Sequence, residues 1–145
     1  MDDLIKTITV DAPPSTVYRA WTTTEGLRSF MAPSSRIDLR EGGDFEILFD
    51  LAQPPGLQGS EGCVVVSFEE DRALAFTWNF PPSLASIRRQ YTIVRLTFDA
   101  DAAGTRVTLR QSGWRDDGEW PAGWAYFDRA WTHVLGQLAS QLTDP

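Results

Sequence analysis

The sequence predicts an α+β fold in which a curved antiparallel sheet wraps around one long C-terminal helix. Two patterns predict this class. Between residues 34 and 110, apolar and polar side chains alternate over several short segments, as expected for strands with one dry face and one wet face. From residue 119 to 142, apolar residues recur at steps of three or four, which indicates a single amphipathic helix. Only this helix is long enough to cover the apolar face of such a sheet.

The first part of the chain is predicted to form one strand and two short helices. Residues 5–10 alternate as a half-buried strand. Pro14 then suits the first turn of a helix, where its missing N–H has no helical partner to lose. Residues 25–31 carry the apolar side chains of a second short helix, which Pro33 stops.

About six strands are expected between the short helices and the terminal helix. Residues 34–39 and 45–51 are predicted to pair as a hairpin, because Gly42 and Gly43 between them can adopt positive φ. The alternating pattern predicts further strands at residues 59–69, 73–80, 94–98 and 106–110. No change of composition marks a boundary, so the sequence predicts one domain over residues 1–145.

The charge of the chain argues against several classes of partner. The net charge is −7, and the 13 basic residues include one lysine. Such a surface repels phosphate backbones and anionic lipid heads, so no nucleic-acid partner is expected. No apolar run approaches the ~20 residues that span a bilayer, and residues 1–4 are acidic rather than basic as in a signal peptide. The sequence therefore predicts a cytoplasmic protein without membrane insertion.

Residue types that carry metals and cofactors are scarce. The single cysteine, Cys63, can neither form an internal disulfide nor build a metal site alone. His133 is the only histidine and is predicted to face solvent, ~200° around the helix from Trp131, so no serine or cysteine triad is expected. Phosphate loops and dinucleotide fingerprints are absent from the sequence. The sequence thus predicts neither a metal nor a cofactor.

The C-terminal part of the chain is rich in aromatic residues, with four of the six tryptophans between residues 114 and 131. Bulky rings on one helix are hard to interdigitate with a concave sheet, and the gaps between them predict a pocket, although core packing would explain any single ring. A dry void of ~300 Å³ would cost ~7 kcal/mol, so the pocket is expected to be ligand-filled, hydrated or partly collapsed. The candidate lining residues are Phe30, Met31, Phe49, Trp78, Phe80, Trp114, Trp124, Phe127 and Trp131.

Polar groups that could orient a ligand are fewer. Asp128 lies four residues after Trp124 and shares its side of the helix, where a buried carboxyl could bind a hydroxyl or act as a general acid or base. The alternative is an ion pair with an arginine of the sheet. Tyr91 is the other candidate acid or base, and it follows Arg88 and Arg89, which could guard a mouth or meet an anionic head group. Solvated surface charge is the alternative for the arginines.

Five segments, spread in order over nearly the whole chain, carry a resemblance to a known family. They are PSTVYRAWT (14–22) followed by Pro33, LREGGDF (39–45), LAFTW (74–78), GTRVTL (104–109), and Gly113-Trp114 with FDRAW (127–131). Together they resemble the family of homologues of the heat shock protein 90 ATPase activator, within the START-like, polyketide-cyclase-like (SRPBCC) superfamily.

The resemblance implies a helix-grip fold that encloses an apolar cavity between the sheet and the terminal helix. In the superfamily this cavity holds lipids, hormones, polyketides and other small molecules, so the resemblance implies binding of a small apolar or amphipathic molecule. A cyclase-like or hydrolase-like enzyme using the same cavity is an alternative. A co-chaperone or stress-related interaction module is a second, in which the chain is similar to the C-terminal domain of the co-chaperone that gives the family its name.

Overall fold

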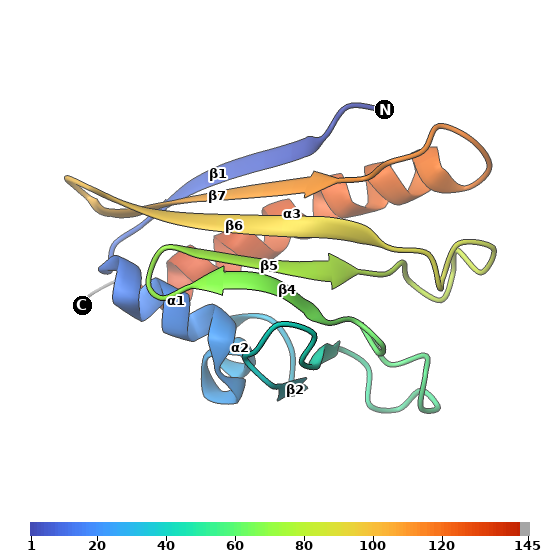
Figure 1. Ribbon diagram of the computed structural model, residues 1–145, viewed down its shortest axis with the longest axis horizontal. Helices are drawn as coiled ribbons and strands as arrows, with labels where there is room; N and C mark the ends of the chain where they lie inside the picture. Colours follow the sequence, from blue (N-terminus) through green and yellow to red (C-terminus); the bar gives the residue numbers. More distant parts are fainter. Residues whose placement is uncertain (143–145) are drawn as a thin grey trace.

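The computed structural model describes residues 1–142 as one sheet, a smaller strand pair and three helices (Figure 1). Five strands form an antiparallel sheet in the order β1-β7-β6-β5-β4, and β2 pairs with β3. The strands are β1 (Leu4–Val10), β2 (Ser34–Ile37), β3 (Phe45–Leu48), β4 (Val65–Glu69), β5 (Ala73–Trp78), β6 (Thr92–Asp101) and β7 (Gly104–Ser112). The helices are α1 (Pro14–Thr22), α2 (Thr24–Phe30) and α3 (Trp120–Gln141).

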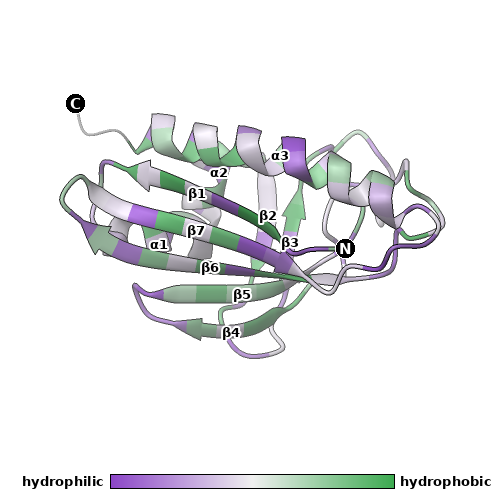
Figure 2. Ribbon diagram, turned by 90° about the horizontal axis from the view of Figure 1, so that it is seen from above, coloured by the Kyte–Doolittle hydropathy of each residue, from purple (hydrophilic) through white to green (hydrophobic). Residues whose placement is uncertain are grey.

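The long helix α3 lies along one face of the five-stranded sheet, as Figure 2 shows. Its buried residues, which include Phe127, Trp131, Leu135 and Leu138, recur at steps of three and four. On the sheet, Leu96 of β6 stands opposite Leu74 of β5 and Leu109 of β7, and all three are buried. The predicted α+β helix-grip fold is confirmed, because one apolar stripe on the helix meets one apolar face of the sheet.

The two short helices connect β1 to β2 and pack at the edge of the same core. Pro14 occupies the first turn of α1, as its missing N–H allows. Thr23 separates the helices, and its side-chain oxygen accepts a hydrogen bond of 3.0 Å from the N–H of Gly26, which caps α2. Trp21 of α1 is fully buried, with its ring 5.1 Å from that of Phe30.

The strand pair β2–β3 forms the hairpin that the sequence predicts, with Gly42 in its turn at φ 78°. The strand boundaries were wrong on its C-terminal side. β3 ends at Leu48 rather than at residue 51, and β4 begins at Val65 rather than at residue 59. Residues 49–62, which we call the mouth loop, lie outside the regular strands, and Pro54-Pro55 at its tip have no backbone N–H to donate to a ladder. Isolated bridges, Leu48 with Gly59 and Asp44 with Val64, tie this region back to the fold.

No helix within residues 1–142 is both long enough and apolar enough to cross a membrane.

Candidate functional site

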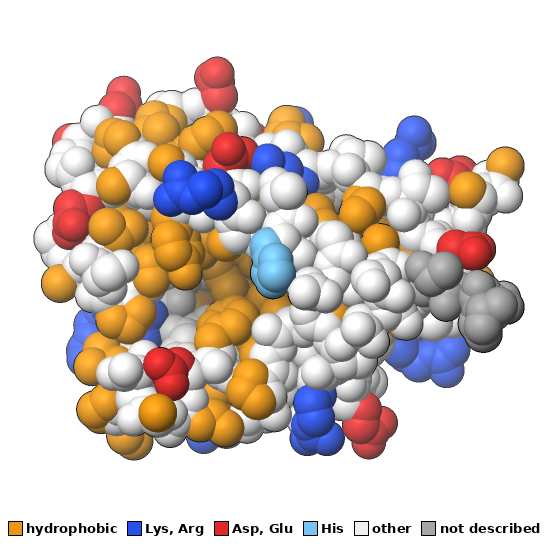
Figure 3. Space-filling model, turned by 180° about the vertical axis from the view of Figure 1, so that it is seen from behind, with side chains coloured by type: hydrophobic (Ala, Val, Ile, Leu, Met, Phe, Trp, Pro, Cys, Tyr) orange, Lys and Arg blue, Asp and Glu red, His pale blue; other side chains and the backbone are white. Residues whose placement is uncertain are grey.

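A cleft lined by apolar side chains opens beside α3, next to the single histidine in Figure 3. It has two lobes that share Phe49, Trp78, Tyr126 and Phe127. The first, which we call the polar lobe, has a volume of about 340 Å³ and is bounded by the mouth loop, the end of β5 with the chain after it, and α3. The second, the aromatic lobe, has a volume of about 310 Å³ and is completed by Met31, Ala130, Trp131, His133 and Val134.

Aromatic rings form the floor that joins the lobes. The Trp78 ring lies 5.4 Å from the Trp131 ring, and the Phe49 ring meets Trp78 edge to face at 6.3 Å. Phe127 continues the wall along α3, 6.2 Å from Trp131 and 5.7 Å from Phe80. Contacts between aromatic rings add to the energy of apolar burial, so these pairs stabilise the floor.

A chain of buried hydrogen bonds fixes the two tryptophans of this floor. The indole N–H of Trp131 donates to the side-chain oxygen of Gln111 at 2.8 Å, and the Gln111 amide donates to the Thr92 hydroxyl at 2.8 Å. That hydroxyl donates to the Trp78 carbonyl at 3.2 Å. Gln111 and Thr92 are 0% and 1% exposed, so these bonds form away from water and link α3 to three strands.

Phe80, which follows β5, packs against α3 and against the segment that leads into this helix. Its ring lies 4.9 Å from Trp120 and 5.8 Å from Trp114. The helix can approach the ring because position 123 is glycine; a Cβ there would lie 2.5 Å from Cε1 of Phe80. This packing sets the position of one wall of the polar lobe.

Six of the nine residues predicted to line the pocket surround the cleft. They are Met31, Phe49, Trp78, Phe80, Phe127 and Trp131. The other three lie elsewhere. Phe30 packs against Trp21 and borders a more open depression that adjoins the aromatic lobe at Met31, His133 and Val134. Trp114 packs against Phe80. Trp124 lies near the N-terminus, where its indole N–H donates to the Asp2 carbonyl at 3.1 Å.

The predicted acid and base groups do not line the cleft. Asp128 forms an ion pair with Lys6 of β1, with 2.6 Å between its Oδ1 and the lysine Nζ. The expected pair with the sheet is therefore present, but the partner is the lysine rather than an arginine. Tyr91 is 44% exposed and lies outside both lobes. His133 is exposed, as predicted, and borders the aromatic lobe.

Arg88 is buried, which corrects the expectation of a solvated surface charge. Its side chain is 9% exposed and pairs with Glu61, at 3.3 Å between Nη2 and Oε1. Nη1 donates to the carbonyls of Phe80 at 2.6 Å and Gly59 at 2.8 Å, and Nη2 donates to the carbonyl of Gly56 at 2.6 Å. The guanidinium thus fastens the mouth loop to the chain after β5.

Glu61 completes this fastening from within the mouth loop. Its carboxylate accepts hydrogen bonds from the N–H groups of Gly59 at 2.7 Å and Gln58 at 3.1 Å, and also from Gly56. Burial opposes ionisation of the carboxyl, but these backbone N–H donors outweigh it, so the pKa of Glu61 lies below its ordinary value. The loop that forms the mouth is therefore organised around one ionised pair.

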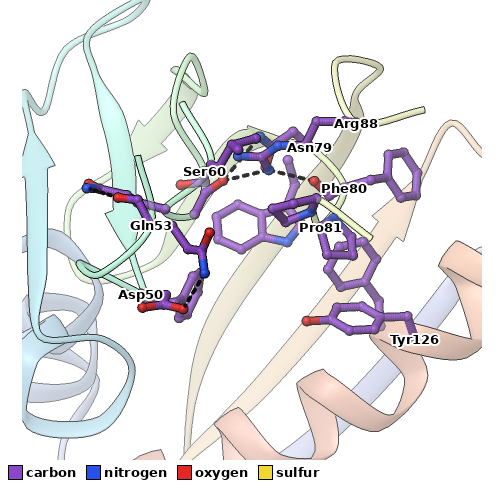
Figure 4. A pocket seen from close by; sticks show the side chains of 15 residues that line it. Asp50, Gln53, Ser60, Asn79, Phe80, Pro81, Arg88 and Tyr126 are labelled. Atoms are coloured by element: carbon purple, nitrogen blue, oxygen red, sulfur yellow. Dashed lines mark hydrogen bonds between the residues drawn. The ribbon is translucent and has the colours of Figure 1, made fainter. Parts of the chain in front are cut away.

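Asp50 and several uncharged polar side chains line the rest of the polar lobe (Figure 4). The Asn79 amide donates to the Gly59 carbonyl at 3.3 Å, and the Gln53 amide lies 3.5 Å from a carboxylate oxygen of Asp50. In Figure 4 the phenol oxygen of Tyr126 points from α3 into the space between the helix and the mouth loop. Asn79 follows β5 directly and is 6% exposed, because the mouth loop covers it.

Within residues 1–142, no three histidine, cysteine, aspartate or glutamate side chains come close enough to hold a metal ion. Cys63 is fully buried, and burial raises the pKa of its thiol to about 12. The cleft presents aromatic surface and hydrogen-bonding groups to a ligand.

The sequence profile of one protein family matches residues 11–143, and that family is described as Activator of Hsp90 ATPase homolog 1-like protein. The chain belongs to this family. No curated protein matches the chain in sequence.

Solved structures share the fold of this Activator of Hsp90 ATPase homolog 1-like chain. Protein MLL2253 from Mesorhizobium loti is similar with a TM-score of 0.78 and 20% identity, over 99% of this chain and 100% of that one. The Aha1 dimer from Colwellia psychrerythraea gives 0.72 at 18% identity, over 98% and 96%. CalU16 from Micromonospora echinospora gives 0.73 at 20% identity, over 97% and 75%. These similarities support the helix-grip fold.

Proposed function

We propose that the protein binds a small apolar or amphipathic molecule in the cleft between the mouth loop, β5 and α3. The observation that carries the proposal is the continuous aromatic floor of Trp78, Phe127 and Trp131 beneath an open mouth. Ligand pockets are mostly apolar and carry a few placed polar groups, and each lobe falls near the lower end of their usual ~300–1,000 Å³ range.

The exposed rings at the rim support the same proposal. Phe49 and Tyr126 are 41% and 40% exposed, although both face the cleft. Covering such rings removes apolar surface from water and contributes ~25 cal/mol for each Å² covered. A ligand seated between them would gain this energy without any rearrangement of the core.

The positions of the two predicted acid or base residues favour binding over catalysis in the cleft. Asp128 is engaged by Lys6 on the β1 side of α3, and Tyr91 lies outside both lobes. A general acid or base must come within hydrogen-bond reach of the reacting atom, and neither group does so for a molecule in the cleft.

The binding test uses N-phenyl-1-naphthylamine, an uncharged probe whose fluorescence rises in apolar surroundings. We expect saturable binding to the purified protein. Ala130 lines the aromatic lobe, so Ala130→Phe should fill it and weaken binding, whereas Ala125→Phe, at an exposed position of the same helix, should not. No saturable signal, or equal loss in both variants, would contradict the proposal.

A second pair of variants keeps this test valid if Ala130→Phe folds poorly. Phe49→Ala removes a ring of the cleft rim, and Phe68→Ala removes an equally exposed ring that lines neither lobe, at 41% and 40% exposure respectively. We expect only Phe49→Ala to weaken probe binding. Equal effects of the two would show that the probe binds outside the cleft.

A chaperone-related role is a second candidate function. The family description names activation of the Hsp90 ATPase, and one structural neighbour is an Aha1 dimer. The test is the ATPase rate of the chaperone with and without the purified protein. A concentration-dependent rise would support the role, and an unchanged rate together with no complex on size-exclusion chromatography would exclude it.

A further inference from the structure

We infer that the cleft selects a ligand whose apolar body ends in an uncharged hydroxyl or carbonyl group, and that it discriminates against an anionic end. The inference rests on the proposed function, because it concerns the ligand of the same cleft. It follows from how the charged groups of the polar lobe are already used.

Arg88 is the one cation among the described residues that line the polar lobe, and its terminal N–H groups already have partners. Nη1 donates to two carbonyls, and Nη2 donates to the Gly56 carbonyl and pairs with Glu61. Arginine holds carboxylates through two parallel N–H groups. Four of the five guanidinium N–H bonds are occupied, which leaves no such pair for a ligand.

The charges around the polar lobe do not favour an anion either. Glu61 neutralises Arg88, and its N–H donors keep it ionised. Asp50 lies in the same lobe and accepts hydrogen bonds from the Ala52 N–H at 3.1 Å and the Gln53 amide at 3.5 Å. A ligand carboxylate in this lobe would therefore lie close to a negative charge that no cation lining the described part of the lobe balances.

The other polar side chains of the lobe are uncharged and can bind an uncharged ligand group. The Tyr126 phenol points into the cleft (Figure 4), and it can both donate and accept a hydrogen bond. The amides of Asn79 and Gln53 line the same lobe. Next to them lie the rings of Trp78 and Phe127, which both lobes share. A ligand with a flat apolar body could lie against these rings, and its hydroxyl or carbonyl end could then hydrogen-bond to the phenol or the amides.

The test is a matched series on one skeleton at pH 7, with binding followed by tryptophan fluorescence and calorimetry. The members are naphthalene, 2-naphthalenemethanol, 2-naphthoate and 2-naphthylmethylamine. We expect the alcohol to bind about tenfold more tightly than the carboxylate, because the carboxylate would lie close to the like charge of Asp50 at the protein surface. Tyr126→Phe should weaken the alcohol several-fold and leave naphthalene unchanged.

Asp50→Asn provides the charge test. It should reduce the difference in affinity between the alcohol and the carboxylate. Asp99→Asn, an equal charge change at an exposed position of β6, should leave that difference unchanged. Equal or tighter binding of the carboxylate, or tightest binding of the amine, would overturn the inference and leave ligand binding in the cleft intact. If neither naphthalene nor any derivative binds, the proposed function itself fails and the inference with it.

Discussion

Gly123 offers a sharp test of how the cleft wall is packed. A Cβ at this position would lie 2.5 Å from Cε1 and 2.8 Å from Cδ1 of Phe80. Phe80 is 1% exposed and already contacts the rings of Trp114, Trp120 and Phe127, so it has no free direction except toward the polar lobe that it lines. We therefore expect Gly123→Ala to overpack the wall.

The expected magnitude follows from two opposing terms. Replacing glycine by alanine inside a helix favours folding by ~1 kcal/mol, and overpacking a dense core costs ~1–3 kcal/mol. The net effect of Gly123→Ala is then a loss of ~0–2 kcal/mol of unfolding free energy. Gly136→Ala in the same helix is the matched control, because a Cβ added there would meet no atom within 4 Å apart from the backbone of its own helix turn. It should gain the full ~1 kcal/mol.

The assay is equilibrium unfolding in urea, followed by tryptophan fluorescence, together with thermal unfolding. For a chain of this size, 1 kcal/mol corresponds to a Tm shift of about 2–4 °C, so the two variants should differ by several degrees in Tm. Gly123→Ala should also weaken binding of N-phenyl-1-naphthylamine, because the displaced Phe80 ring narrows the polar lobe. Equal stabilisation by both substitutions would refute the idea that Phe80 is fixed against α3.

Two further predictions concern the mouth loop and its neighbour Cys63. Glu61→Gln should cost about 1–3 kcal/mol at pH 7, because the partly buried N–H groups of Gln58 and Gly59 lose their charged acceptor. The pKa of Glu61 is lowered in the folded state, so the advantage of the natural protein is full above pH ~4.3 and is lost as pH falls through the folded pKa. The urea midpoints of the natural protein and Glu61→Gln should therefore converge on acidification. Glu41→Gln, an exposed control, should have the same midpoint as the natural protein throughout. Cys63, with its pKa raised to about 12, should resist iodoacetamide at pH 8 until denaturant is added, and rapid labelling of the folded protein would contradict its burial.

Most of the fold was predictable from the sequence because its signals are local. The period of two placed Leu74, Leu96 and Leu109 on the inner face of the sheet, and all three are buried there. The boundaries failed at residues 49–51 and 59–64, which were predicted to continue the strands but lie outside the regular ladder, most of them in the mouth loop. Alternation predicts which face a side chain would take in a strand, and it cannot predict whether the backbone pairing there is regular.

Among the residues of the candidate site, only the aromatic side chains that belong to both the core and the cleft could be predicted from the sequence. Aromatic residues on the inner faces of β5 and α3, such as Trp78 and Trp131, had to meet in space, so the pattern identified them. Trp124 carries the same signal and lies elsewhere, because the helix turns it toward the N-terminus. Asn79, Gln53 and Tyr126 gave no signal, since their place in the cleft depends on the path of the mouth loop.

Hydrophobic periodicity acts within each element, so it is enough to predict the fold class, the long aromatic helix and the apolar character of what that helix covers. The electrostatics of the cleft depends instead on contacts between segments that are distant in the chain. Arg88 and Glu61 are 27 positions apart in the chain and meet only after folding. Their pairing fastens the mouth loop to the chain after β5, and it thereby engages the one cation among the described residues that line the polar lobe.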